Sequence, residues 1–296
     1  MTIFDYKLLT ALDAVVTYQS FDKAAASLAI TQSAISQRIK LLEEQIARPV
    51  IVRTQPIALT KIGEKIRSHY KLVHQLEQEL VNELNLTADK TTDMAIAVNA
   101  DSLAIWFTQV IAPLVSKYNV EFNIIVDDEN RTLERLKSGE AMAAVSAVEK
   151  SIKGFKSEKL GDVKYVLAAT PSFRDQYFAK GLSKKSLAAA PAASFDQFDD
   201  MHFKFAQNNF QIIERSYPCH FLRSSEAIVN LVKQSAACAL IPDIQISNEL
   251  ADKSLVIINE NHPLIEPLYW HSWVLVKGQY RALCKEIERL AKQALS

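Results

Sequence analysis

The chain has 296 residues, enough for two or three domains, and its 34 basic and 34 acidic side chains cancel to a net charge of zero. Its apolar share of 49% and charged share of 23% are typical of globular proteins, and no stretch approaches the roughly 18 consecutive apolar residues that span a bilayer. The strong basic excess of many nucleic-acid-binding domains is missing, so any DNA-binding surface must depend on local charge.

Charged side chains interrupt the apolar residues of the N-terminal stretch 1–16, so no signal peptide is expected and the cytoplasm is the predicted location. The cysteines, Cys219, Cys238 and Cys284, are widely spaced and form no C-x-x-C pair. This pattern predicts neither a disulfide framework nor a zinc site, and favours core packing over a redox-sensing thiol. The histidines show no ligand spacing either, so no metal and no cofactor are expected.

Residues 5–17 are predicted to form the first helix, because leucine and valine recur on one of its faces. Two shorter helical patterns follow, one at about 21–29 and one that starts after Thr31. Ser20 and Thr31 are suited to cap them, since a hydroxyl at this position accepts a hydrogen bond from the first helical turn.

The second short helix has two distinct faces. One is apolar, and the other carries polar residues at helical spacing: Ser33, Ser36, Gln37 and Lys40. Short polar side chains near the helix N-terminus and a cation further along are what a helix in a DNA major groove needs, for base edges and phosphates respectively. Periodicity alone leaves open an ordinary amphipathic hairpin with a solvated face.

The residues from Phe21 through TQSAIS (31–36) to Arg53 resemble the N-terminal winged helix-turn-helix of LysR-type transcriptional regulators. The resemblance implies a wing at 49–60, although Ala47 stands where the family usually has glycine and a second wing arginine is missing beside Pro56. We expect bases to be contacted by Ser33, Ser36 and Gln37 and phosphates by Lys40 and Arg53, within a DNA-binding set of Thr31, Gln32, Ser33, Ser36, Gln37, Arg38, Lys40 and Arg53.

Residues 61–86 are predicted to form one long helix with a narrow apolar stripe. The stripe could pack against the helix's own domain or against a partner helix. The resemblance implies a homodimer, with pairing into tetramers left open, and we expect the interface to contain Ile66, Tyr70, Val73, Leu76, Leu80 and Leu84. Residues 87–93 are polar and predict a hinge.

From residue 94 onward, strands alternate with helices, which predicts α/β architecture with parallel-rich sheets. This part resembles the two-lobed effector domain of LysR-type regulators, which is similar to periplasmic binding proteins. One lobe is expected at about 94–165 and 268–296 and the other at about 166–267. The predicted fold class is therefore an all-α winged helix-turn-helix (1–60) with a linker helix (61–86), followed by an α/β effector domain (94–296).

Polar clusters follow several predicted strands, and ligands of α/β sheets bind beyond the carboxyl ends of strands. Serines at helix starts suit a carboxylate and acids suit a cation, although both are also common as helix caps and in solvated loops. The candidate effector-binding residues are Asn99, Asp101, Ser102, Glu129, Thr132, Phe195, Asp196, Ser225 and Glu226.

The strings NADSLA (99–104), DDMH (199–202), SSEA (224–227) and LYWH (268–271) resemble one LysR-type subfamily, the arginine-export regulators. This resemblance implies lysine or arginine as co-effector, and promoter DNA and RNA polymerase as partners. No nucleophile elbow, P-loop or zinc-protease motif occurs, so an enzyme is not expected. The alternative function is an amino-acid-binding or amino-acid-processing domain whose N-terminal helices serve only for assembly.

Overall fold

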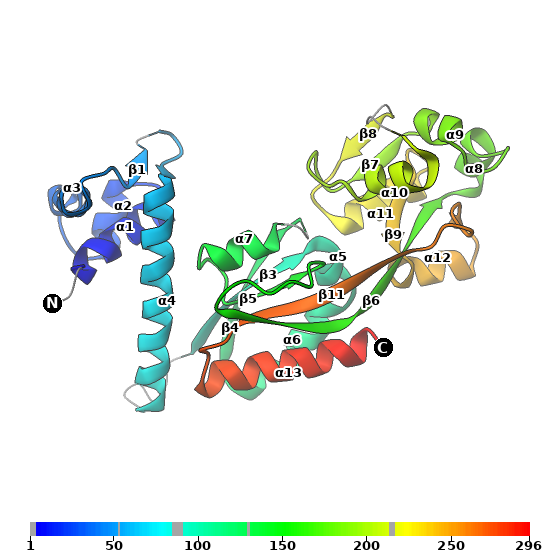
Figure 1. Ribbon diagram of the computed structural model, residues 1–296. Coiled ribbons are helices and arrows are strands. Elements are labelled where there is room, and N and C mark those ends of the chain that lie inside the picture. Colours follow the sequence, from blue (N-terminus) through cyan, green and yellow to red (C-terminus); the bar gives the residue numbers. More distant parts are fainter. Residues whose placement is uncertain (1–3, 53, 85–90, 129–130, 213–216) are drawn as a thin grey trace. The chain divides into compact units, whose positions relative to one another are not determined.

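The computed structural model of the protein describes residues 4–52, 54–84, 91–128, 131–212 and 217–296. The chain forms two compact units, one built essentially from residues up to 90 and the other from most of the residues beyond. The elements of the first unit are α1 (Tyr6–Tyr18), α2 (Phe21–Ser27), α3 (Gln32–Ile46), β1 (Ile51–Val52), β2 (Ala58–Leu59) and α4 (Lys61–Glu83) (Figure 1).

Side-chain caps set the starts of the first three helices. The Asp5 carboxylate accepts a hydrogen bond from the backbone N–H of Lys7, at 2.9 Å. Ser20 and Thr31 accept bonds from the third residue of α2 and α3, at 3.3 and 3.2 Å, which confirms both predicted caps. The apolar faces of these helices meet in one core with Val50, Ile51 and Ile66.

The wing is a short antiparallel hairpin in which Ile51 of β1 faces Leu59 of β2. Ala47 ends α3 in the left-handed backbone region, with φ of 55°, which favours glycine. Gly63 allows α4 to lie close to the backbone just before β1, since a Cβ there would clash with the carbonyl oxygen of Val50. The predicted hairpin is therefore confirmed, whereas Arg53 lies outside the described residues.

The later helices are α5 (Ala100–Ser102), the π-helix η1 (Leu103–Phe107), α6 (Thr108–Tyr118), α7 (Thr132–Lys137), α8 (Pro171–Tyr177), α9 (Lys184–Ala189), α10 (Met201–Phe210), α11 (Ser225–Lys233), the 3₁₀-helix η2 (Asp243–Ile246), α12 (Ser247–Ala251) and α13 (Gly278–Ala294). The strands are β3 (Thr92–Asn99), β4 (Val120–Asp127), β5 (Ala143–Ser146), β6 (Phe155–Ala169), β7 (Ala192–Ser194), β8 (Cys219–Phe221), β9 (Ala239–Pro242), β10 (Val256–Ile257) and β11 (Leu264–Trp273). None of the described helices is long and apolar enough to cross a membrane.

The main sheet has the order β10-β6-β11-β5-β3-β4, and β9 also pairs with β6. Only the pairings of β3 with β4 and β5 are parallel. The expectation of a parallel-rich sheet is therefore wrong for this sheet. The reason is that β6 and β11, which connect the two halves of the unit, run antiparallel to each other and to their other neighbours.

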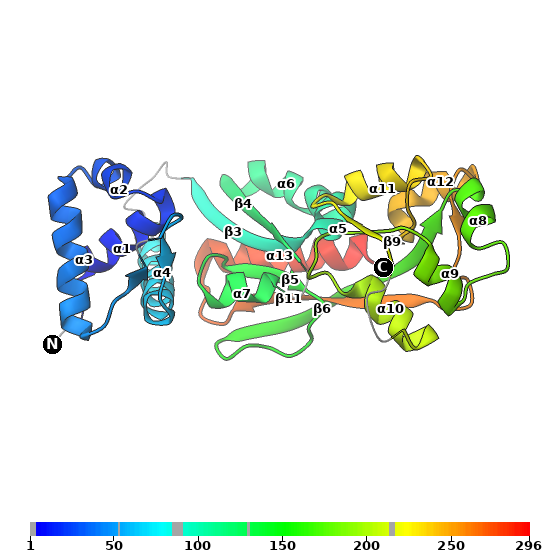
Figure 2. The same ribbon diagram turned by 90° about the horizontal axis from the view of Figure 1, so that it is seen from above.

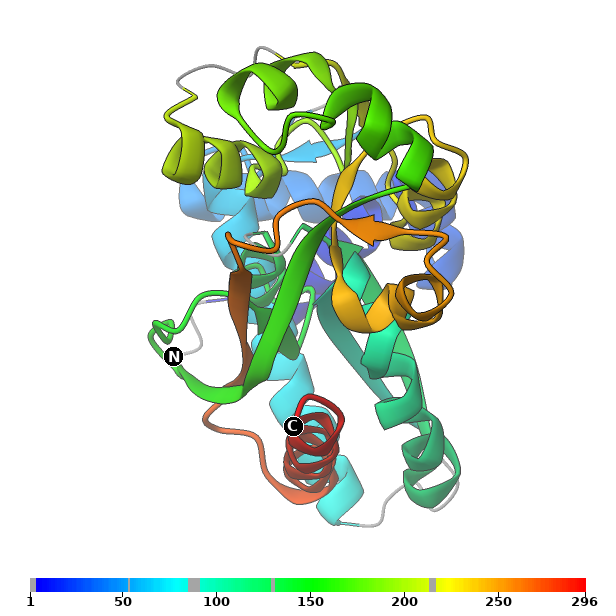
Figure 3. The same ribbon diagram turned by 90° about the vertical axis from the view of Figure 1, so that its right-hand side faces the viewer.

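The long strand β6 links two lobes of this unit (Figure 3). Its first part pairs with β11 up to Tyr165, and from there it pairs with β9 and β10. We call the part with β3, β4, β5, β11, α6 and α13 the first lobe. The part with β7 to β10 and α8 to α12 is the second lobe. In the first lobe α6 and α13 lie on the same side of the sheet and share an ion pair of 3.2 Å between Lys117 and Glu286 (Figure 1).

Alternating residues of β6 build two cores in the second lobe. Val166 and Ala168 pack with α11 and η2 on one face, whereas Leu167 and Ala169 pack with α8, α9 and α10 on the other. Figure 2 shows α11 on one side of β9 and α9 and α10 on the other. The strand is buried on both faces here, so its sequence is continuously apolar rather than alternating.

Candidate functional site

The outer face of α3 is the first candidate site. Its inner face is fixed by Ile35, Ile39 and Leu42, which are fully buried. The predicted DNA-binding residues divide by exposure: Ser36 and Arg38 are half-buried, and the remainder of the described set is exposed, namely Thr31, Gln32, Ser33, Gln37 and Lys40. A cap at Thr31 and a cation one turn from the exposed amide of Gln37 give this face the polarity that major-groove contacts need.

A cavity between the two lobes is the second candidate site. It lies where β3, β4 and β7 end and where α11 begins. The first lobe contributes Asn99, Ala100, Asp101, Asp127 and Asp128, and the second contributes Ala193, Ser194, Phe195, Asp199, Met201, His202, Ser225, Ile228, Leu240, Ile241 and Pro242. Carboxylates therefore dominate its charged lining, which suits a cationic ligand.

Of the predicted effector-binding residues, the structure brings Asn99, Asp101, Phe195 and Ser225 together in this lining. Others lie beside the cavity rather than in it. Ser102 and Thr132 are buried, and the Ser102 hydroxyl finds no hydrogen-bond partner among the described residues. Glu226 is exposed and accepts a 2.9 Å hydrogen bond from Ser224, and the predicted Glu129 lies outside the described residues.

Asp101, which lines the cavity, joins the two lobes. Its carboxylate accepts hydrogen bonds from the hydroxyls of Ser225, at 2.6 Å, and Tyr165, at 2.8 Å. Burial raises the pKa of Asp101 above its ordinary value, although both hydroxyls act in the opposite direction. The two residues that we expected to bind opposite ends of a ligand therefore bind each other in this structure.

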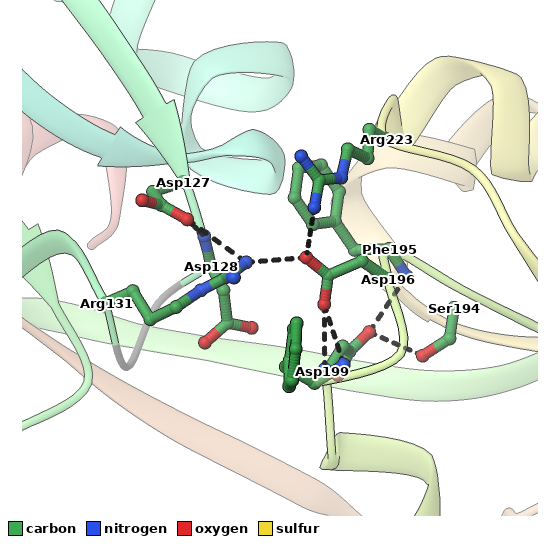
Figure 4. A network of polar contacts seen from close by, with 9 residues as sticks. Asp127, Asp128, Arg131, Ser194, Phe195, Asp196, Asp199 and Arg223 are labelled. Carbon is green, nitrogen blue, oxygen red and sulfur yellow. Dashed lines mark hydrogen bonds and ion pairs between the residues drawn. The ribbon is translucent and has the colours of Figure 1, made fainter. Parts of the chain in front are cut away.

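Asp196 also joins the lobes, next to the lining residues Phe195 and Asp199 (Figure 4). Its carboxylate accepts hydrogen bonds from Arg131 of the first lobe, at 2.6 Å, and from Arg223 of the second, at 3.2 Å. Burial would raise the pKa of Asp196, but the backbone N–H of Phe198 and the Arg131 guanidinium outweigh it and hold the pKa below its ordinary value. Asp196 is thus a charged carboxylate close to the cavity.

Several lining residues were not predicted. Asp127 ends β4 and Asp128 follows it; the polar loop after this strand was recognised from sequence, but Glu129 and Thr132 were selected from it instead. Asp199 accepts hydrogen bonds from the Ser194 hydroxyl, at 2.6 Å, and from the backbone N–H of Phe195, at 3.0 Å, and so holds the loop after β7 in place. No local sequence signal marks that role. His202, in α10, was not predicted because the helix itself was not.

Comparison with known proteins finds a matching family for both parts of the chain. Residues 6–64 match the family model of the bacterial regulatory helix-turn-helix protein, lysR family, and residues 93–282 match that of the LysR substrate binding domain. The HTH-type transcriptional regulator ArgP of Aeromonas salmonicida is 46% identical over 296 residues, covering 100% of this chain and 99% of the relative. The ArgP of Photobacterium profundum is 41% identical and covers 98% of both chains.

Solved structures are similar over nearly the whole chain. The crystal structure of ArgP from Mycobacterium tuberculosis is similar with a TM-score of 0.83 and 30% identity, covering 97% of both chains. Full-length LysG from Corynebacterium glutamicum, solved with bound effector Arg, has a TM-score of 0.74 and 27% identity, and covers 98% of this chain and 99% of its own.

Proposed function

The chain belongs to the LysR family of bacterial regulatory helix-turn-helix proteins, and we propose that it controls genes of basic amino acid export or metabolism in response to lysine or arginine. It is a DNA-binding transcriptional regulator and not an enzyme. The match of both parts to one regulatory family decides against the alternative in which the N-terminal helices serve only for assembly. We assign DNA binding to residues 1–60, dimerisation to 61–86 and effector binding to 94–296, and we place the protein in the cytoplasm.

For the DNA contact, we assign the major-groove surface to the outer face of α3. Ser33, Ser36 and Gln37 would contact base edges and Lys40 a phosphate, with Thr31, Gln32 and Arg38 beside them and Arg53 of the wing as a further phosphate contact. The exposure of the α3 face supports this assignment. Lys40 stands 3.7 Å from Glu44, but both side chains are well exposed, so this pair is weak and leaves Lys40 available to a phosphate.

For the effector, the acidic lining of the interlobe cavity carries the proposal. A lysine or arginine side chain would find carboxylates from both lobes, among them Asp127, Asp128 and Asp199. The relative LysG, whose structure contains bound effector Arg, supports this choice of ligand. Asn99, Phe195 and Ser225 would complete the site, and Ser102 offers a buried hydroxyl without a partner among the described residues.

For assembly, we propose a homodimer that binds two half-sites of promoter DNA. The interface would be supplied by the exposed leucines Leu76 and Leu80 on the second half of α4 and by Leu84 directly after it. Regulation further implies contact with RNA polymerase, and pairing of dimers into tetramers would extend the same arrangement.

Titration calorimetry on the full-length protein tests the ligand. We expect lysine and arginine to bind, and norleucine, which has the same carbon skeleton as lysine but no side-chain cation, to bind far more weakly. Asp128→Asn, which removes one buried cavity carboxylate, should weaken lysine binding roughly tenfold or more, because a hydrogen bond to a charged group contributes about 1.5–3 kcal/mol.

The matched control is Asp175→Asn, which removes an exposed carboxylate of α8 outside the cavity and should leave binding unchanged. Norleucine binding as tightly as lysine would contradict the proposed ligand class. Equal losses for both variants would contradict the proposed site.

A further inference from the structure

Asp196 has no free position for a ligand in this structure. One carboxylate oxygen, Oδ1, accepts hydrogen bonds from the backbone N–H groups of Phe198, at 2.8 Å, and Asp199, at 3.2 Å. The other, Oδ2, accepts from Nη2 of Arg131, at 2.6 Å, and Nη2 of Arg223, at 3.2 Å. With only 4% of the residue exposed, a cation can pair with this carboxylate only by displacing a guanidinium.

The two arginines are not equivalent. Arg223 belongs to the same lobe as Asp196 and its side chain is 71% exposed, so its ion pair is largely solvated. Arg131 comes from the other lobe and its side chain is 32% exposed. Its Nη2 atom also lies 3.1 Å from Asp127 Oδ1, and its guanidinium stands 5.5 Å from the ring centroid of Phe198. Arg131 therefore ties a carboxylate and an aromatic ring of the second lobe to a carboxylate of the first.

This contact is strong but incomplete. The Nε atom of Arg131 is buried and has no hydrogen-bond partner among the described residues, and a buried donor without an acceptor is unfavourable. A free ligand can adjust its position to satisfy its donors, whereas Arg131 is tethered to the loop after β4. A cationic ligand can therefore replace Arg131 at its two carboxylates.

We infer that Arg131 is an internal competitor of the effector, whose guanidinium occupies the Asp127–Asp196 carboxylates until the cationic group of a basic amino acid displaces it. The inference rests on the proposed function, since it concerns regulation of the same cavity. Displacement of Arg131 breaks the ion pair between the lobes, so effector binding and lobe arrangement are coupled. Arg131 thereby lowers the affinity of the protein for the effector. It also ensures that effector binding changes the contact between the two lobes.

The test is calorimetry of full-length protein with L-arginine and L-lysine, comparing the wild type with Arg131→Gln. Glutamine keeps a polar side chain but no charge, so Asp196 loses its cationic partner from the other lobe and keeps the solvated pair with Arg223. Both amino acids should bind at least about fivefold more tightly, the lower end of typical coupling between linked equilibria. Arg223→Gln removes the other guanidinium on the same oxygen and should change the affinity by less than about twofold, because that pair is solvated.

Unchanged or weaker binding by Arg131→Gln would overturn the inference, since it would make Arg131 a bystander or a ligand contact. Arg131→Lys provides a second test if the glutamine variant does not fold, because a compact ammonium forms fewer of these contacts than a guanidinium. The lysine variant should bind the effector more tightly than the wild type does. Weaker effector binding by this variant would equally overturn the inference. Absence of binding by the wild type and every variant is a different outcome, which would contradict the proposed function itself.

Discussion

Gln37 is the residue on which sequence-specific DNA recognition should depend most. It lies on the exposed face of α3, whose opposite face is fixed in the core by Ile35 and Ile39. An amide side chain can form paired hydrogen bonds with an adenine edge, whereas an ammonium such as that of Lys40 contacts phosphates without reading sequence. Replacing Gln37 and replacing Lys40 should therefore change DNA-binding affinity in different ways.

Gln37→Ala should weaken binding to the cognate site by roughly 1–3 kcal/mol, with a much smaller loss on random DNA. Lys40→Ala should weaken binding to both DNAs alike and reduce the dependence of affinity on salt. Fluorescence anisotropy titrations on both DNAs measure these effects, and Gln45→Ala, an exposed amide in the last turn of the same helix, is the control. Equal losses on both DNAs for Gln37→Ala would rule out its role in base recognition.

Residue roles were predictable where they follow from periodicity or capping. Ser20 and Thr31 cap α2 and α3 as expected, because a helix N-terminus needs a local acceptor and the chain offers few nearby. The partner of Asp196 was not predictable in this way. Arg131 is 65 positions away in sequence, and only the packing of the two lobes brings their side chains together.

At the scale of elements, the apolar stripe of α4 is buried in its first half and exposed in its second. Ile66 is buried in the core of the first unit and Tyr70 packs against it, so this part of the predicted stripe stabilises the helix's own unit. Arg67 adds a 2.7 Å ion pair with Asp13 of α1. The stripe then continues into leucines that are exposed, among them Leu80 at 54%. The first alternative, packing against the helix's own unit, therefore applies to the first half of α4, and the exposed second half is where we propose that a partner helix packs.

Leu80→Glu should convert the dimer to a monomer and abolish tight operator binding, because it places a charge without a partner in the proposed interface. The first unit should still fold, since Leu80 lies outside its core. Multi-angle light scattering measures the mass, and Lys65→Glu, exposed on the same helix but outside the stripe, is the control. A Leu80→Glu variant with the mass of a dimer would show that the interface lies elsewhere.

Elements of the second unit were predicted unevenly. Strands β3 and β4 were found, because short apolar runs bounded by polar residues are a clear signal. The first half of β6, at 155–162, was missed. Its sequence contains several lysines and acidic residues, a composition that is typical of a loop. Helices α8, α9 and α10 were missed as well. The first two are only 7 and 6 residues long, too short to show helical periodicity.

At the scale of the whole molecule, the regulator must convert ligand binding into a change in DNA binding. A ligand achieves this only if it binds one arrangement of the lobes more tightly than another. Asp101 with Ser225 at the cavity, and Arg131 with Asp196 beside it, are contacts between the lobes, so the proposed basic amino acid effector would act on both. The family resemblance predicted this architecture from sequence, but not these interlobe contacts, which depend on tertiary packing.

The most direct test of the account is a footprint of the full-length protein on the DNA around its own gene, with L-lysine, L-arginine, norleucine or no addition. We expect a protected site whose extent changes, or whose binding midpoint shifts by roughly fivefold or more, with lysine or arginine and not with norleucine. A footprint with the same extent and midpoint under all four conditions would contradict the claim that this chain regulates transcription in response to basic amino acids.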